Sequence, residues 1–85
     1  MKKVYENALV EYTKAIKKNP EDAQAYLNLS MAYHGLNNGK NSILAAQKAH
    51  DLFQKIGNSP KAAEVRAKLR ELHKVYAITP DETKK

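Results

Sequence analysis

The sequence contains no cysteine and no tryptophan, and only three glycines and three prolines occur among its 85 residues. Without cysteine, neither a disulfide framework nor a thiolate metal site can form, so stability must come from packing. The longest uninterrupted apolar run, Ile43–Ala46, is too short to cross a membrane, and no apolar stretch typical of a secretory signal follows Lys2 and Lys3. We therefore expect a cytoplasmic protein that has no membrane partner.

Acidic residues are also in deficit. Fifteen Lys and Arg against nine Asp and Glu give a net charge of +6, which attracts acidic partners electrostatically. The last 25 residues carry a basic strip made of Lys61, Arg66, Lys68, Arg70 and Lys74. Such a strip could follow nucleic-acid phosphates. Because no nucleic-acid motif accompanies it, and because Glu64 and Glu71 are spaced to pair with neighbouring lysines, we favour a solvated face and keep a nucleic-acid-binding domain as an alternative.

Apolar residues recur at helical spacing in four segments, which predicts an all-α protein. The expected helices cover about residues 2–18, 21–35, 40–56 and 60–76. Pro20, the Asn37–Gly39 segment and Gly57 separate them, because proline ends a helix while asparagine and glycine tolerate the left-handed conformation of helix ends. Ser59 is the expected N-cap of the last helix, with proline at the first helical position.

Connections of only a few residues favour successive antiparallel hairpins. We expect one domain over residues 1–78 and a polar tail over residues 79–85. The apolar residues that share one face are Val4, Tyr5, Ala8, Leu9, Tyr12, Ala15 and Ile16 in the first helix, and Ile43, Ala46, Ala49 and Phe53 in the third. The predicted buried faces of the other two helices are Tyr26, Leu29, Tyr33 and Leu36 in the second, and Val65, Leu69, Leu72 and Tyr76 in the fourth.

The chain repeats itself with a period of 34 residues. Under this shift Ala8 falls on Ser42 and Ala15 on Ala49, so small residues meet small residues. Two helices approach closely only where side chains are short, and larger side chains fill the gaps beside such points. The small residues therefore predict the contact points between helices.

The spacing of these residues resembles the tetratricopeptide repeat (TPR) family, whose period is 34. Tyr26-x2-Leu29-Ser30-x2-Tyr33 resembles the first-helix signature, and Tyr5-x2-Ala8-x3-Tyr12-x2-Ala15 resembles the second-helix signature. The resemblance covers about residues 4–53, with the last helix similar to a capping helix. It implies stacked antiparallel helix hairpins, a fragment of a right-handed superhelix with about one and a half repeats.

Three positions depart from the family pattern. Gly39 occupies an aromatic position, Ala46 the position of Tyr12, and Gln54 that of Pro20, so the third helix is expected to pack less tightly and to run longer. The chain also begins at a helix that resembles the second helix of a TPR unit. We expect Val4, Leu9 and Tyr12 to lack a cover, which another copy of the chain or the rest of a longer protein could supply.

The family resemblance implies a protein-interaction scaffold that binds a peptide in a groove. The positions on the groove side are Gln24, Leu27, Asn28, Met31 and His34, with Arg70 from the last helix. Amide, thioether and imidazole groups suit a peptide backbone and its apolar anchors. The alternatives are that these residues are ordinary half-exposed side chains, and that the chain is a designed or truncated repeat fragment without a ligand.

Asn28 also matches the asparagine of the TPR subset that grips the acidic C-terminal tails of cytosolic heat-shock chaperones. Glu64 stands where that subset needs arginine. A negative charge at this position repels a terminal carboxylate, so we do not expect chaperone-tail binding.

Catalytic motifs are missing from the sequence. His34, His50 and His73 do not have metal-ligand spacing, and neither a phosphate loop nor a nucleophile motif occurs. We therefore expect neither an enzyme nor a cofactor.

Overall fold

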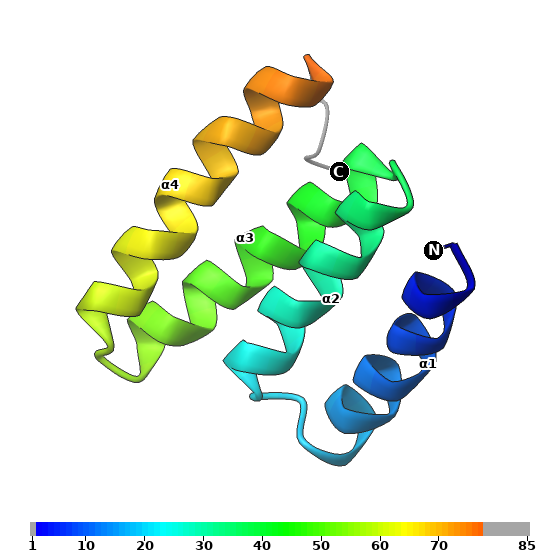
Figure 1. Cartoon of the computed structure of the whole chain (residues 1–85). Helices are drawn as coiled ribbons and strands as arrows, with labels where there is room; N and C mark the ends of the chain where they lie inside the picture. The colour runs from blue at the N-terminus through cyan, green and yellow to red at the C-terminus, as the bar shows by residue number, and fades with distance from the viewer. Residues whose placement is uncertain (1, 78–85) are drawn as a thin grey trace.

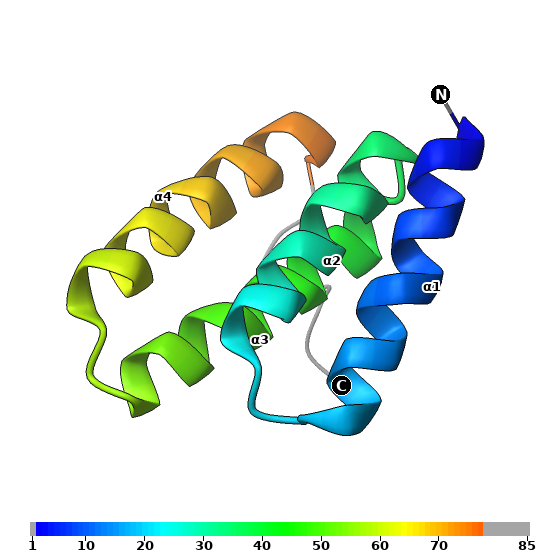
Figure 2. The ribbon, with the colours of Figure 1, turned by 60° about the horizontal axis from the view of Figure 1, so that its bottom comes forward.

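The computed structural model describes residues 2–77, which form four α-helices and no strand. The helices are α1 (Lys2–Lys18), α2 (Ala23–Gly35), α3 (Gly39–Lys55) and α4 (Ser59–Tyr76). They lie side by side in chain order as successive hairpins, with α1 and α4 at opposite ends of the row (Figures 1 and 2). The predicted all-α hairpin fold is confirmed, whereas the tail predicted over residues 79–85 lies outside the described residues.

Side chains of the connecting segments cap three of the helices. The carboxylate of Asp22 accepts from the Ala25 N–H, Asn38 Oδ1 from the Asn41 N–H, and Asn58 Oδ1 from the Lys61 N–H, at 3.0 to 3.3 Å. Each bond satisfies one of the amides that have no partner within their own helix. The prediction of Ser59 as N-cap is wrong, since α4 begins one residue earlier and Asn58 takes that role.

The α2–α3 and α3–α4 turns share one hydrogen-bond pattern. After α2, Asn37 adopts φ 60°, and the Asn38 N–H donates to the carbonyl of Tyr33 at 2.9 Å. After α3, Gly57 adopts φ 78°, and the Asn58 N–H donates to the carbonyl of Phe53 at 2.9 Å. This is the Schellman arrangement, in which a left-handed residue closes the helix. In both turns the next asparagine then caps the following helix.

The core lies between α2, α3 and α4. Its buried residues are Ala23, Leu27, Ile43, Ala46, Ala49, Leu52, Phe53, Ala62, Val65, Leu69 and Leu72. The predicted faces of α3 and α4 are therefore confirmed, except that Tyr76 is only partly buried. α3 carries eight buried residues, so the expectation that it packs less tightly is wrong. With 17 residues it is also no longer than α1. In contrast, α1 has no buried residue, and Val4 is 62% exposed.

The predicted buried face of α2 requires correction. Tyr26, Leu29, Tyr33 and Leu36 are only half-buried. The first three line a shallow depression of about 230 Å³ on the α2–α3 surface. The fully buried residues of α2 are Ala23, Ala25, Leu27, Ser30 and Ala32. Because α2 packs against α1 on one side and α3 on the other, it does not have one buried and one exposed face.

Small residues mark the closest helix contacts, as predicted. Ser30 on α2 donates from Oγ to the Ser42 carbonyl at 2.7 Å, and Ser42 on α3 donates from Oγ to the Ser30 carbonyl at 2.8 Å. Both serines are buried, and Ala49 has no exposed surface. Ala8 and Ala15 on α1 are half-buried. Short side chains at these points allow the helix backbones to approach each other.

Candidate functional site

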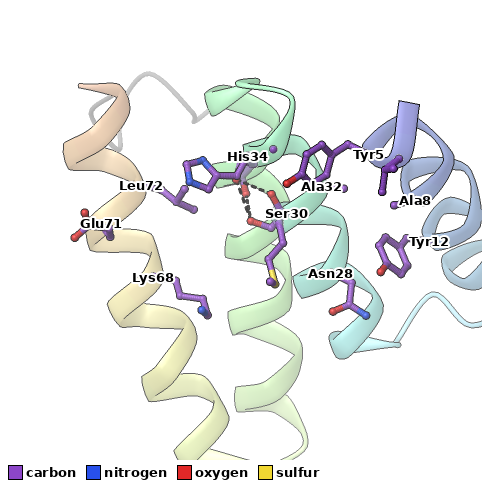
Figure 3. Close-up of a pocket in the computed structure, with 14 residues that line it drawn as sticks. Tyr5, Ala8, Tyr12, Asn28, Ser30, Ala32, His34, Lys68, Glu71 and Leu72 are labelled. Carbon is purple, nitrogen blue, oxygen red and sulfur yellow. Dashed lines mark hydrogen bonds between the residues drawn. The ribbon is translucent and has the colours of Figure 1, made fainter. Parts of the chain in front are cut away.

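An open groove of about 600 Å³ lies along α2. Its floor is α2, one wall is α1 and the other wall is α4 (Figure 3). Apolar residues make up most of its surface, and a few polar groups are placed among them. Binding sites for ligands and protein segments have this combination, because apolar area supplies affinity and a few polar groups supply orientation.

The α1 wall carries Val4, Tyr5, Ala8 and Tyr12. These residues share one face of α1 because they are spaced by three to four residues or lie beside such positions. The ring of Tyr5 lies against Gly35 at the end of α2, where any Cβ would overlap the ring. Gly35 thus allows the Tyr5 ring to hold the N-terminal part of α1 against α2.

The α4 wall is fastened to α2 and α3 by Tyr76. Its hydroxyl lies 2.6 Å from His34 Nδ1, and the two rings form a T-shaped pair with centroids 5.5 Å apart. The same ring covers Gly39, where a Cβ would overlap it. Gly39 occupies the repeat position of Tyr5, so an aromatic ring from α4 fills the space that an aromatic at residue 39 would need.

Three of the residues predicted from sequence line the groove, namely Asn28, Met31 and His34. Met31 is 54% exposed and lies on the floor. Gln24 is exposed outside the lining and donates from Nε2 to Asn28 Oδ1 at 3.0 Å. Gln24 therefore orients the Asn28 amide from one helical turn away.

Leu27 and Arg70 do not face the groove. Leu27 is only 3% exposed and belongs to the core, so the prediction that it lies off the buried face is wrong. The lining residues of α4 are Lys68, Glu71 and Leu72. Arg70 lies two residues from Lys68 and from Leu72, which is about 200° around the helix and therefore on its far side.

The α1 and α4 walls were not predicted from the sequence as parts of a site. The uncovered face of α1 was a signal for one wall, because it predicted exposed apolar residues without placing them beside Met31. For the other wall, the signal was the spacing of Lys68, Glu71 and Leu72 at i, i+3 and i+4, which places them on one helical face. The rotation of α4 about its axis decides which face meets the groove, and only the structure gives that rotation.

Neither a metal site nor a membrane span is found in residues 2–77. No group of three or more His, Asp or Glu side chains is close enough to hold an ion, and no helix is long and apolar enough to cross a bilayer. The groove contains one basic and one acidic side chain on α4, Lys68 and Glu71. Its polar groups can therefore bind and orient a ligand by hydrogen bonds and charge.

Comparison with protein families gives a match over residues 2–37, which span α1, the first turn and α2. The matching family model is described as TPR repeat. Residues 2–37 are therefore similar to a TPR repeat. No curated protein and no solved structure matches it. The family match ends before α3, which shares the 34-residue period of the chain and packs against α2.

TPR repeats are protein–protein interaction modules and are generally not catalytic. The predicted recognition signatures fall on α1 and α2, the two helices that supply one wall and the floor of the groove. The similarity to a TPR repeat therefore suggests a protein partner.

Proposed function

We propose that the protein is an interaction module that holds a segment of a partner protein in the groove between α1, α2 and α4. The observation that carries this proposal is the exposure of Met31 on the groove floor, beside the apolar residues that α1 contributes to the lining. Methionine adapts its shape to irregular apolar surfaces, and a side chain so exposed gains by being covered. A cytoplasmic location and the lack of an enzymatic activity are parts of the same proposal.

The amide pair Gln24–Asn28 would hold the backbone of the bound segment. Within residues 2–77, the hydrogen bond between Gln24 Nε2 and Asn28 Oδ1 uses one donor and one acceptor of the pair. The Asn28 amide nitrogen and the Gln24 amide oxygen make no further hydrogen bond there, so they offer both a donor and an acceptor to a peptide unit. Lys68 and Glu71 would select charged side chains of the same segment from the opposite wall.

The experiment compares partner capture by the native protein and by the double variant Asn28→Ala/Met31→Ala. Proteins that bind the native chain are identified, and the binding segment of each is then titrated as a purified peptide. We expect the double variant to lose at least about tenfold in affinity, while its circular dichroism stays native. The control Val10→Ala/Gln47→Ala removes an apolar and an amide side chain that are exposed outside the groove. Equal binding by the double variant and the native chain would reject the groove as the site.

Self-association through α1 is the second candidate, because α1 has no buried residue. Light scattering coupled to size-exclusion chromatography separates the two candidates. A dimer that Val4→Glu dissolves would support self-association, whereas a monomer at high concentration would reject it. Val4 is the suitable site because it is exposed and lines the groove.

A further inference from the structure

The 34-residue period allows α3 to serve as a reference for α1. Ala8 corresponds to Ser42, and Ala15 corresponds to Ala49. Ser42 and Ala49 are buried because α3 packs between α2 and α4. Their counterparts on α1 are only partly buried. The two helices therefore present the same face, which is covered in α3 and open in α1.

The groove takes the place of a covering helix on α1. On α3, position 42 meets α2 through Ser30, and two hydrogen bonds hold the two backbones together. On α1, the equivalent Ala8 lines the groove. The part of the groove beside Ala8 therefore lies against α1 in the way that α2 lies against α3. Since an α-helix fills the equivalent space beside Ser42, the shape of the groove favours an α-helix over an extended strand as its occupant.

The small side chain of Ala8 sets a further requirement on the occupant. In the α2–α3 pair both residues at the contact point are serines, so neither side chain holds the backbones apart. A helix seated on Ala8 needs Gly, Ala or Ser at the same point, with apolar residues one turn on either side to cover Tyr5 and Tyr12.

The charges on α1 indicate which kind of helix the groove can bind. α1 contains five lysines and two glutamates, and Glu11 lies 3.9 Å from Lys14. At about 100° per residue, Lys3, Lys14 and Lys18 lie on the side of α1 that turns from Val4 away from α2, here called the lysine edge. Glu11 lies on the same side and closer to Val4, which leaves three lysines against one glutamate there. A second copy of the chain would bring the same lysines and another net charge of +6 to this edge. Acidic side chains on the occupant would be attracted instead.

We propose that the half of the groove along α1 binds an acidic amphipathic α-helix of a partner protein, with a small residue of that helix against Ala8. This inference rests on the proposed function and narrows the bound segment in conformation and charge. The occupant lies against α1 as α2 lies against α3, and its acidic residues face the lysine edge of α1.

The probe is a synthetic peptide with the sequence of residues 21–37, since α2 is the helix that covers the reference face. Two forms are made at positions that are exposed in α2, an acidic one with Gln24→Glu and Met31→Glu and a basic one with Gln24→Lys and Met31→Lys. The acidic peptide is titrated into the isotope-labelled full chain and followed by NMR. We expect shift changes at Ala8, Tyr12 and Tyr5, and about tenfold weaker binding of the basic form at low salt.

Matched variants test the face of α1. Val4→Glu and Thr13→Glu place the same charge on the same helix at two exposed positions, but only Val4 lines the groove. We expect Val4→Glu to weaken binding of the acidic peptide by about tenfold or more and Thr13→Glu to change it by less than about threefold. An acidic peptide with Ser30→Leu should not bind, because leucine would overlap Ala8.

Three outcomes would overturn the proposal. They are a lack of shift changes on α1, equal binding of the acidic and basic peptides at low salt, and a homodimer that Val4→Glu dissolves. If the acidic helix fails to bind while Asn28→Ala/Met31→Ala still reduces partner capture, the helix inference is wrong and the proposed function stands. If that double variant also leaves capture unchanged, both are wrong.

Discussion

Ser30 and Ser42 exchange hydrogen bonds across the α2–α3 contact, each hydroxyl donating to the backbone carbonyl of the other residue. The two Oγ atoms lie 3.1 Å apart, and both side chains are buried. Buried hydroxyls that lose their partners destabilise a protein, so this reciprocal pair both permits and requires close approach of the two helices.

A double-mutant cycle on this pair predicts nearly additive losses. Ser30→Ala and Ser42→Ala should each lower the free energy of unfolding by about 1 kcal/mol, because each removes one bond to a different carbonyl. The double variant should lose about 2 kcal/mol, measured by urea denaturation. A coupling energy of about 1 kcal/mol or more would show instead that the bond between the two hydroxyls dominates.

Replacing Gly35 tests how α1 is held. A methyl group at Gly35 overlaps the Tyr5 ring, so Gly35→Ala should destabilise α1 by about 1–3 kcal/mol, although alanine favours helices. Hydrogen exchange should then accelerate in α1 more than in α3. Adding Tyr5→Ala to Gly35→Ala removes the overlap, so the second substitution should cost less in that background than in the native chain. An equal cost would contradict the contact.

Two substitutions of Tyr76 separate the contributions of its ring and of its hydroxyl to the free energy of unfolding. Tyr76→Phe keeps the ring over Gly39 and removes the hydrogen bond to His34, so it should cost about 0.5–1.5 kcal/mol. Tyr76→Ala also uncovers Gly39 and should cost about 2–4 kcal/mol, measured by thermal and urea unfolding. Similar losses for the two variants would mean that the ring contributes little to packing.

Glutamate at two equivalent repeat positions compares α1 with α3. Ala49 has no exposed surface, so Ala49→Glu buries a charge in a packed core and should cost about 2–5 kcal/mol. Ala15 is half-buried, and a glutamate there can reach water, so Ala15→Glu should cost about 1 kcal/mol. Lys55→Glu serves as a surface control, because its ion pair with Glu21 is exposed. Equal costs at residues 15 and 49 would indicate that α1 is covered in solution.

Nucleic acid should not bind at physiological salt. Several basic groups already have partners, since Arg66 donates to His50 Nε2 at 3.0 Å and Lys61 lies 3.8 Å from Glu64. We expect fluorescence anisotropy of a labelled DNA duplex to stay flat at about 0.15 M salt. Micromolar or tighter binding that weakens with salt and disappears in Arg66→Glu would restore nucleic acid as a partner.

Helix positions and small contact residues could be predicted from the sequence because both are local properties. The period of Ala8, Ala15, Ser42 and Ala49 identified the contact points without knowledge of helix orientation. The buried side of α2 could not be predicted in the same way. A helix packed on two sides has apolar residues around most of its circumference, so the choice between Tyr26 and Leu27 as core residues depended on the tertiary packing.

The site was predicted only where one helix determines it. Asn28, Met31 and His34 share one face of α2, and that face is on the floor of the groove. Arg70 was predicted for the wrong side of α4, since the rotation of a helix about its axis depends on how its neighbours pack. Asn58 and Ser59 are both good caps, and the Schellman turn after α3 decides between them.

The three-residue turns after α2 and α3 tie three helices into one mechanical unit, whereas α1 has no buried residue to anchor it. When the two ends of the chain are pulled apart, α1 should therefore peel away at low force, before the remaining helices rupture together. A ligand lodged between α1 and the rest would raise the force of that first rupture. The force at which α1 detaches would thus measure whether the groove is occupied.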